Sequence, residues 1–266
     1  MDGHIKTTVY DDVNDVLNYF STQIQEVAGE RFIGMYVIGS LALGNFNPIS
    51  SDIDFVIVTD IDIDDTLFNR LKHIHSAFAA SHSYWANKID VVYVTIRVLH
   101  NNKDSSLLQY PQVEHGTELF KHFLEDGWIF QLYTLREHGI QVFGPKPSSF
   151  ISPIDPNDMI PAVKAIAEIW LESAQNDPSW LEWLANRECQ VFVIQTLCRM
   201  LYSLRTGSVT SKPVATIWAQ KELGTPWDLL IMRSLSAKQE NSKITQNDME
   251  ETINFIRYTV EQTILR

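Results

Sequence analysis

The feature that most constrains this chain is the interruption between two short apolar runs in residues 36–58. The first run breaks at Gly39 and Ser40, a loop rich in turn-forming residues follows, and the second run opens on two carboxylates, Asp52 and Asp54. Because side chains alternate along a strand, both aspartates point to one face while their apolar neighbours point into the core. Two like charges on one face need compensation, and a divalent cation is the usual means.

Gly39 and Ser40 predict an anion site beside this pair. In a turn of small residues after a strand, backbone N–H groups and a hydroxyl can lie against a phosphate. A lone Asp-x-Asp is more often a solvated turn or a helix cap, but Gly-Ser, a spacer and Asp-Ile-Asp with apolar flanks resembles the nucleotidyltransferase superfamily of DNA polymerase β type. The resemblance implies ATP as co-substrate and Mg²⁺ held by Asp52 and Asp54.

Composition limits the partners. The chain has 266 residues, 45% of them hydrophobic, and a formal net charge of −12. Recognition of a nucleic-acid backbone needs concentrated Lys and Arg, so this charge argues against a nucleic-acid partner. It suits a small cationic molecule, although an acidic surface that only keeps the protein soluble is the plainer explanation.

The sequence predicts a cytoplasmic protein. No window reaches the roughly 18 apolar residues of a membrane span, and residues 1–6 hold no signal-like apolar core. Cys189 and Cys198 face opposite sides of one predicted helix, so we expect buried thiols in a reducing compartment. The oligomeric state is unknown from the sequence.

The first half alternates predicted helices and strands. The patterns predict helices over 8–28, 67–78 and 128–138, and strands over 32–38, 89–98 and 140–143. Asp64 or Thr66 is expected to cap the second of these helices. Gly144-Pro145-Lys146-Pro147 is typical of a linker, so we place a nucleotidyltransferase domain at 1–146 and a helical domain at 147–266.

Asp90 opens the predicted strand 89–98. It is either exposed at the sheet end or the third member of an acidic cluster with Asp52 and Asp54. In the superfamily a third carboxylate arrives from a later strand, and in the aminoglycoside nucleotidyltransferases it is usually Glu. The resemblance therefore implies that Asp90 is a metal ligand or a base. Its side chain is one methylene shorter than that of the usual Glu. His100, His115, His122 and His138 lack the paired spacing of a zinc site, and we expect solvated or hydrogen-bonded rings.

The second half reads as a helical bundle. Apolar residues recur at three and four spacing in five segments, 159–174, 181–204, 214–223, 227–235 and 247–265. The predicted fold class is therefore α+β: a polymerase β-like domain with a mixed sheet and flanking helices, followed by an α-helical C-terminal bundle.

Three segments of this half, residues 197–202, 206–207 and 211–219, resemble the C-terminal domain of streptomycin and spectinomycin adenylyltransferases. That family has a Leu-x-Arg helix, then Thr-Gly, then a Lys that opens a helix bearing Ala-x-x-Trp-Ala. The resemblance implies that Lys212 helps to hold the triphosphate, whereas a lysine without this context would be a surface residue. Arg199 is a phosphate contact or a structural ion pair with Glu188.

The acceptor side departs from the family pattern. Glu188 is the nearest counterpart of an acidic residue that the streptomycin enzymes use on the antibiotic, in a shifted register, and Glu118 stands where those enzymes have a Trp. The missing Trp argues against streptomycin as the acceptor. An acidic aromatic cleft is an alternative, although helical spacing makes most of its members core residues; the set is Trp128, Trp170, Trp180, Trp183, Glu172 and Glu182.

The sequence therefore predicts a Mg²⁺-dependent adenylyltransferase that moves AMP from ATP to a hydroxyl of a small cationic acceptor, an aminoglycoside or aminocyclitol antibiotic, and so confers resistance. One rival is the same chemistry on a protein or tRNA acceptor, as in toxin–antitoxin pairs; the long helical half argues against it. The other is a catalytically silent nucleotide-binding protein, which the three intact aspartates argue against.

Overall fold

The computed structural model describes residues 6–100, 108–236 and 243–265. The chain separates into two compact units, Met1–Pro153 and Ile154–Arg266. The sequence placed the division after residue 146. The segment between the two positions is tied to the first unit, because Arg136 Nε donates a 2.9 Å hydrogen bond to the Ile151 carbonyl. Just before this segment, the Tyr36 hydroxyl donates a 2.8 Å bond to the Pro145 carbonyl.

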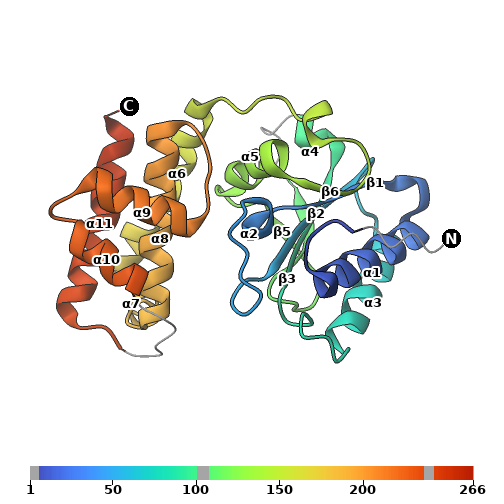
Figure 1. Cartoon of the computed structure of the whole chain (residues 1–266), viewed down its shortest axis with the longest axis horizontal. Coiled ribbons are helices and arrows are strands. Elements are labelled where there is room, and N and C mark those ends of the chain that lie inside the picture. The colour runs from blue at the N-terminus through green and yellow to red at the C-terminus, as the bar shows by residue number, and fades with distance from the viewer. Residues whose placement is uncertain (1–5, 101–107, 237–242, 266) are drawn as a thin grey trace. The chain divides into compact units, whose positions relative to one another are not determined.

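The first unit is built on a six-stranded sheet in the order β5-β4-β3-β2-β1-β6 (Figure 1). The strands are β1 (Phe32–Val37), β2 (Ile53–Thr59), β3 (Ile89–Thr95), β4 (Gln109–Val113), β5 (Phe120–Phe123) and β6 (Ile140–Phe143). Only the β2–β3 pair is parallel; the other neighbours are antiparallel. A parallel pair needs a crossover, and α3 (Asp65–Ala79) supplies it.

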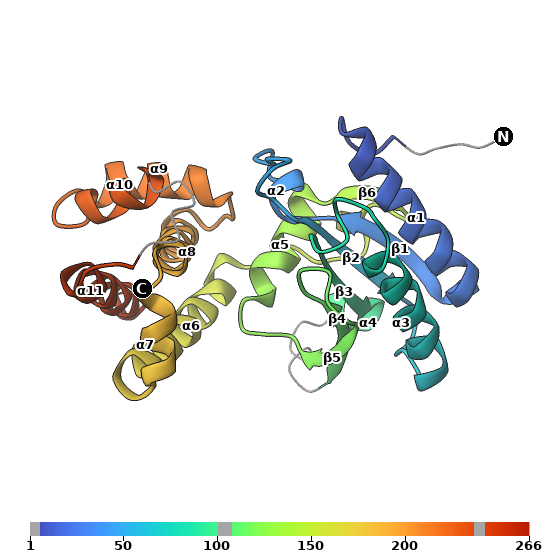
Figure 2. The same ribbon diagram turned by 90° about the horizontal axis from the view of Figure 1, so that it is seen from below.

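Helices cover both faces of this sheet, as Figure 2 shows. On one face α1 (Asp11–Ala28) and α3 bury their apolar stripes against the inward residues of β1, β2 and β3. On the other face lies α5 (Trp128–His138). The capping prediction is confirmed at Asp64, whose side chain accepts a 2.8 Å hydrogen bond from the Leu67 N–H.

Two short elements depart from the sequence prediction. The predicted strand over 89–98 ends at Thr95, where α4 (Ile96–His100) begins. The β-branched residues at the end of this segment lie in a helix although they favour strands, because tertiary contacts can override local strand propensity. The short strands β4 and β5 were not predicted at all, since Pro111 and a run of polar residues hide their alternation.

All named elements of the second unit are helices, and its described residues hold one isolated β-bridge, between Asn186 and Lys243. Its helices are α6 (Met159–Asn176), α7 (Pro178–Leu184), α8 (Arg187–Thr206), α9 (Lys212–Leu223), α10 (Asp228–Ser236) and α11 (Gln246–Ile264). Gly207 ends α8 in the left-handed conformation, as the Thr-Gly pair predicted. The predicted helix over 181–204 is wrong in one respect: it is two helices, because the Asn186 side chain accepts a 2.8 Å bond from the Glu188 N–H and caps a new helix.

The α8, α10 and α11 helices share a polar cluster inside the bundle. Asp248 accepts from Arg187 at 3.3 Å and lies 3.6 Å from Arg233, and the buried Gln190 amide donates to the Asp248 carbonyl at 3.1 Å. Charges inside a bundle are tolerated only when paired in this way. The predicted fold class, a mixed sheet with flanking helices followed by a helical bundle, is confirmed.

Candidate active site

The parallel pairing of β2 with β3 brings the predicted carboxylates together. Asp54 lies opposite Asp90 in the register, and Asp52 immediately precedes β2. The apolar neighbours Ile53 and Phe55 are 0% and 1% exposed, so the alternation predicted from the sequence is confirmed. Asp52 and Asp54 are only partly buried and lie at the start of the strand, before the buried Val56 and Val58 of the same face.

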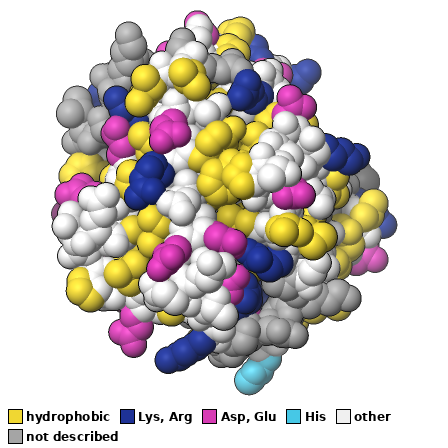
Figure 3. Space-filling model, turned by 90° about the vertical axis from the view of Figure 1, so that its left-hand side faces the viewer, with side chains coloured by type: hydrophobic (Ala, Val, Ile, Leu, Met, Phe, Trp, Pro, Cys, Tyr) yellow, Lys and Arg dark blue, Asp and Glu magenta, His cyan; other side chains and the backbone are white. Residues whose placement is uncertain are grey.

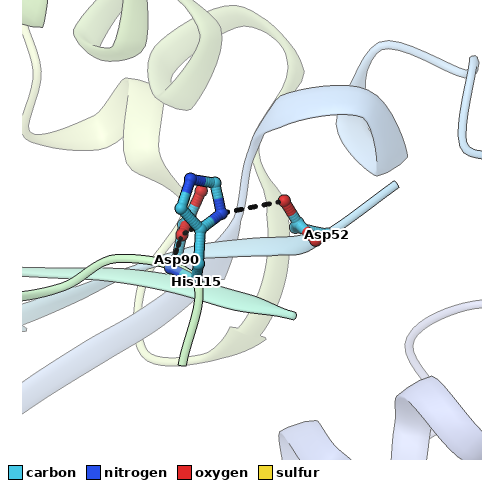
Figure 4. A group of neighbouring side chains, drawn as sticks. All are labelled: Asp52, Asp90 and His115. Atoms are coloured by element: carbon cyan, nitrogen blue, oxygen red, sulfur yellow. Dashed lines mark hydrogen bonds and ion pairs between the residues drawn. The ribbon is translucent and has the colours of Figure 1, made fainter. Parts of the chain in front are cut away.

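Among the described residues, Asp52, Asp90 and His115 each offer a possible ligand atom, and these atoms lie within 4.8 Å of one another (Figure 4). The predicted ligand Asp54 is not part of this group. His115 Nδ1 lies 3.4 Å from Asp52 Oδ2 and 3.9 Å from Asp90 Oδ1. The His115 backbone N–H also donates a 2.6 Å hydrogen bond to Asp90 Oδ1. In the described part of the chain, two carboxylates and one imidazole therefore lie together at the end of the sheet where β2 and β3 begin.

No motif in the sequence indicates a functional role for His115. The ring is 73% exposed, as expected for a solvated histidine, but it also faces two carboxylates. It reaches them because β4 runs antiparallel to β3, with Val113 opposite Val91, so the residues after β4 return to the start of β3. Prediction of β4 was the missing step.

Burial shapes the charge of Asp90. Desolvation raises the pKa of this carboxyl, the His115 N–H and ring lower it in part, and the Asp52 charge raises it again. Two carboxylates that face one another in a partly buried position are best kept ionised by a cation. The donors present therefore fit a divalent metal ion, with two hard oxygen ligands and one nitrogen.

Gly39 and Ser40 lie next to Asp54 at the start of α2 (Gly39–Ala42). The Ile38 N–H donates a 2.9 Å hydrogen bond to the Asp54 carbonyl, which ties this turn to β2. Gly39 has φ +62°, and a Cβ there would collide with the Asp54 carboxylate, so only glycine allows the close approach. Ser40 Oγ is buried and makes no hydrogen bond within the described part of the chain.

In the second unit, Lys212 is the first residue of α9 and Glu188 the second of α8. Lys212 Nζ lies 4.3 Å from the centroid of the Phe192 ring, a cation–π contact. Glu188 is exposed. The proposed roles of these two residues stay predictions.

The tryptophans named in the sequence divide between the units. Trp128 is 4% exposed in α5 of the first unit, so it belongs to a core. Trp170, Trp180 and Trp183 form a cluster of aromatic rings in the second unit around Phe192, which is 44% exposed. The ring centroids lie 5.9 Å apart for Trp180–Trp183, and 6.3 Å apart for both Trp170–Phe192 and Trp183–Phe192. On the face drawn in Figure 3, hydrophobic side chains lie among charges of both signs.

Comparison with known proteins matches both halves of the chain. Residues 22–113 match the nucleotidyltransferase domain family, and residues 149–262 match the family of the aminoglycoside adenylyltransferase C-terminal domain. The aminoglycoside (3'') (9) adenylyltransferase of Rhizobium radiobacter is 24% identical over 98% of this chain and 97% of its own length. The spectinomycin 9-adenylyltransferase of Staphylococcus aureus is 26% identical over 74% of each chain.

A solved structure shows the same fold. A crystal structure of a spectinomycin adenyltransferase from Enterococcus faecialis with ATP and spectinomycin superposes with a TM-score of 0.70 at 17% identity, covering 96% of this chain and 100% of that one. Among the residues described here, no helix is long and apolar enough to cross a membrane. With both domains in the same order and a relative matched along nearly its whole length, the chain is a nucleotidyltransferase related to the aminoglycoside adenylyltransferases.

Proposed function

We propose that the chain transfers AMP from ATP to a hydroxyl of an aminocyclitol or aminoglycoside antibiotic in the cytoplasm and so confers resistance. The observation that supports the proposal is the approach of Asp52 to Asp90, with Asp54 opposite Asp90 in the strand register and against the Gly39 turn. The names of the relatives, which match this chain in both domains, point to the same reaction.

The acidic group is the proposed metal site. Asp52, Asp54 and Asp90 would hold Mg²⁺, which supplies positive charge to the triphosphate and to the departing pyrophosphate. Gly39 offers backbone approach without a side chain, and the buried Ser40 hydroxyl has its donor available for a phosphate oxygen. Lys212 adds a point charge at the first turn of a helix, where anions are favoured.

Asp90 is proposed to take the proton of the acceptor. The His115 N–H holds Oδ1, which leaves Oδ2 for the acceptor hydroxyl. The hydroxyl oxygen then bonds to the α-phosphorus, the bond from that phosphorus to the β-phosphate oxygen breaks, and pyrophosphate leaves with the electron pair. Glu188 is the proposed contact for an ammonium group of the acceptor, and the net charge of −12 favours such a cation.

The full chain with ATP, Mg²⁺ and a panel of acceptors tests this function through acceptor-dependent release of pyrophosphate. We expect release with amine-bearing aminocyclitols and none with a neutral sugar. Release with a protein or tRNA hydroxyl alone would overturn the antibiotic assignment and keep the nucleotidyltransferase chemistry. No release with any acceptor, together with tight ATP binding, would indicate the silent nucleotide-binding protein.

A further inference from the structure

His115 brings a nitrogen donor to a site whose other proposed ligands are oxygens. Nδ1 points at the carboxylates, 3.4 Å from Asp52 Oδ2 and 3.9 Å from Asp90 Oδ1 (Figure 4). Ligand atoms about 2.0–2.2 Å from one ion lie roughly 3–3.5 Å apart. The separation from Asp52 is within this range, and the separation from Asp90 is slightly longer.

The loop that carries His115 is anchored from both sides. The His115 N–H bonds to Asp90 Oδ1 at 2.6 Å, and the Gly116 N–H bonds to the Ile89 carbonyl at 2.9 Å. Gly116 has φ +65°, and a Cβ there would strike the backbone of Ala86. These contacts fix the backbone of His115 beside β3. His115 has φ +49°, an uncommon value for a residue with a side chain.

This arrangement separates two roles of His115. Its backbone N–H orients Asp90, a role that any residue able to adopt the turn fulfils. Its ring does not pack into a core, since the side chain is 73% exposed. The ring is directed at the two carboxylates, and Nδ1 is the atom that faces them.

Imidazole changes which cation a site prefers. Mg²⁺ takes oxygen ligands and keeps much of its water, whereas first-row transition ions accept nitrogen readily and bind a mixed N/O set more tightly. We propose that His115 Nδ1 is a metal ligand together with Asp52 and Asp90, and that this site prefers a first-row transition ion such as Mn²⁺ or Co²⁺ over Mg²⁺. The inference rests on the proposed function, in which these carboxylates hold the metal, and deepens it; Mg²⁺ at high concentration can still occupy the oxygens.

Direct metal binding to the full chain tests the inference without reference to turnover. Titration calorimetry gives the affinities for Mn²⁺ and Mg²⁺, and pulsed electron paramagnetic resonance of bound Mn²⁺ detects the ¹⁴N of a coordinated imidazole. The variant His115→Asn removes the ring and keeps a residue that tolerates positive φ. The matched control is His73→Ala, which removes an exposed histidine from α3.

We expect the ¹⁴N signal in the wild type and the His73 variant and its loss in His115→Asn, with Mn²⁺ affinity lowered about tenfold or more and Mg²⁺ affinity little changed. Mn²⁺ bound without a ¹⁴N signal, or an equal loss for both ions in His115→Asn, would overturn the inference and reduce His115 to an ion pair with Asp52; AMP transfer would then still stand. If neither ion binds and no transfer occurs, the inference and the proposed function both fail.

Discussion

The two units of this chain differ in how strongly the fold determines which functional residues become neighbours. In the first unit the parallel register of β2 and β3 sets Asp54 beside Asp90, so residues on separate strands meet by construction. In the second unit Lys212 and Glu188 stand near the starts of two different helices, and helix packing provides no such register. A carboxylate pair on neighbouring strands is therefore a stronger prediction than two charges on neighbouring helices.

The largest effect is expected at the carboxylates of the first unit. Asp52→Asn and Asp90→Asn should each lower kcat by about a thousandfold, equal to about 4 kcal/mol of lost transition-state stabilisation. The midpoint of urea unfolding should stay level or rise, because each change removes one of two like charges. A variant that keeps more than about a tenth of wild-type turnover would contradict the metal assignment.

The Gly39 contact with Asp54 can be isolated by a matched pair of glycines. Gly39 and Gly44 both have positive φ, +62° and +70°, but a Cβ at Gly44 meets nothing within 4 Å. Each change to Ala should cost about 1 kcal/mol in backbone strain. Only Gly39→Ala should also push the Asp54 carboxylate aside and lower kcat/KM, by about a hundredfold in our expectation. Equal kinetics in the two variants would remove this turn from the site.

In the second unit, Lys212→Ala tests a role predicted for a residue on a helix, where no strand register supports the prediction. Loss of a phosphate contact should raise the Kd of a non-hydrolysable ATP analogue about tenfold, or about 1.4 kcal/mol, and leave the acceptor affinity unchanged. Lys221→Ala, which removes an exposed charge from the last turn of the same helix, is the control. Calorimetry with equal Kd values for wild type and Lys212→Ala would make Lys212 only a surface partner of Phe192.

We expect the stability of the first unit to depend on pH through a buried histidine in its core, and we expect no such dependence in the bundle. Burial lowers the pKa of His75 to about 3, and Nε2 lies 2.7 Å from the Tyr93 hydroxyl. The folded pKa is below the unfolded value of about 6.5, so the stability contribution is complete above pH 6.5 and is lost as pH falls toward 3. Between pH 7.5 and 5.5 the free energy of unfolding of this unit should fall by about 1.4 kcal/mol.

His75→Gln supplies the comparison, because it removes the titrating group and can still bond Tyr93. Hydrogen exchange at the strand amides of the first unit, measured as a function of urea, gives both free energies. We expect the variant to lose most of the difference between the two pH values, whatever its absolute stability. An unchanged difference would assign the pH dependence to other groups.

The smallest effect is expected on the acceptor side. Glu188→Gln should raise the acceptor KM a few-fold and leave that of ATP unchanged, because an exposed charge pair is worth about 1 kcal/mol or less. NaCl should raise the same KM by screening over about 8 Å at 0.15 M. Glu261→Gln on α11 is the control, and an equal change in both variants would leave only a general field effect.

The same contrast explains what the sequence could predict. Periodicity identifies α1, α3 and the apolar strands β1 and β2, and alternation places Asp52 and Asp54 on one face. The sequence could not predict His115, since its place depends on a short strand that contains Pro111. Nor could it predict the break before α8, which a single side chain creates: Asn186 caps a new helix inside an otherwise continuous apolar pattern.

The most direct test of the account follows the phosphorus atoms of ATP. The full chain is incubated with an amine-bearing aminocyclitol and with ATP labelled at either the α- or the γ-phosphorus. If AMP is transferred, the α-label moves to the antibiotic and the γ-label leaves as pyrophosphate. Appearance of the γ-label on the antibiotic would show phosphoryl transfer, and label on neither would show that this acceptor is not a substrate; either result would contradict the account.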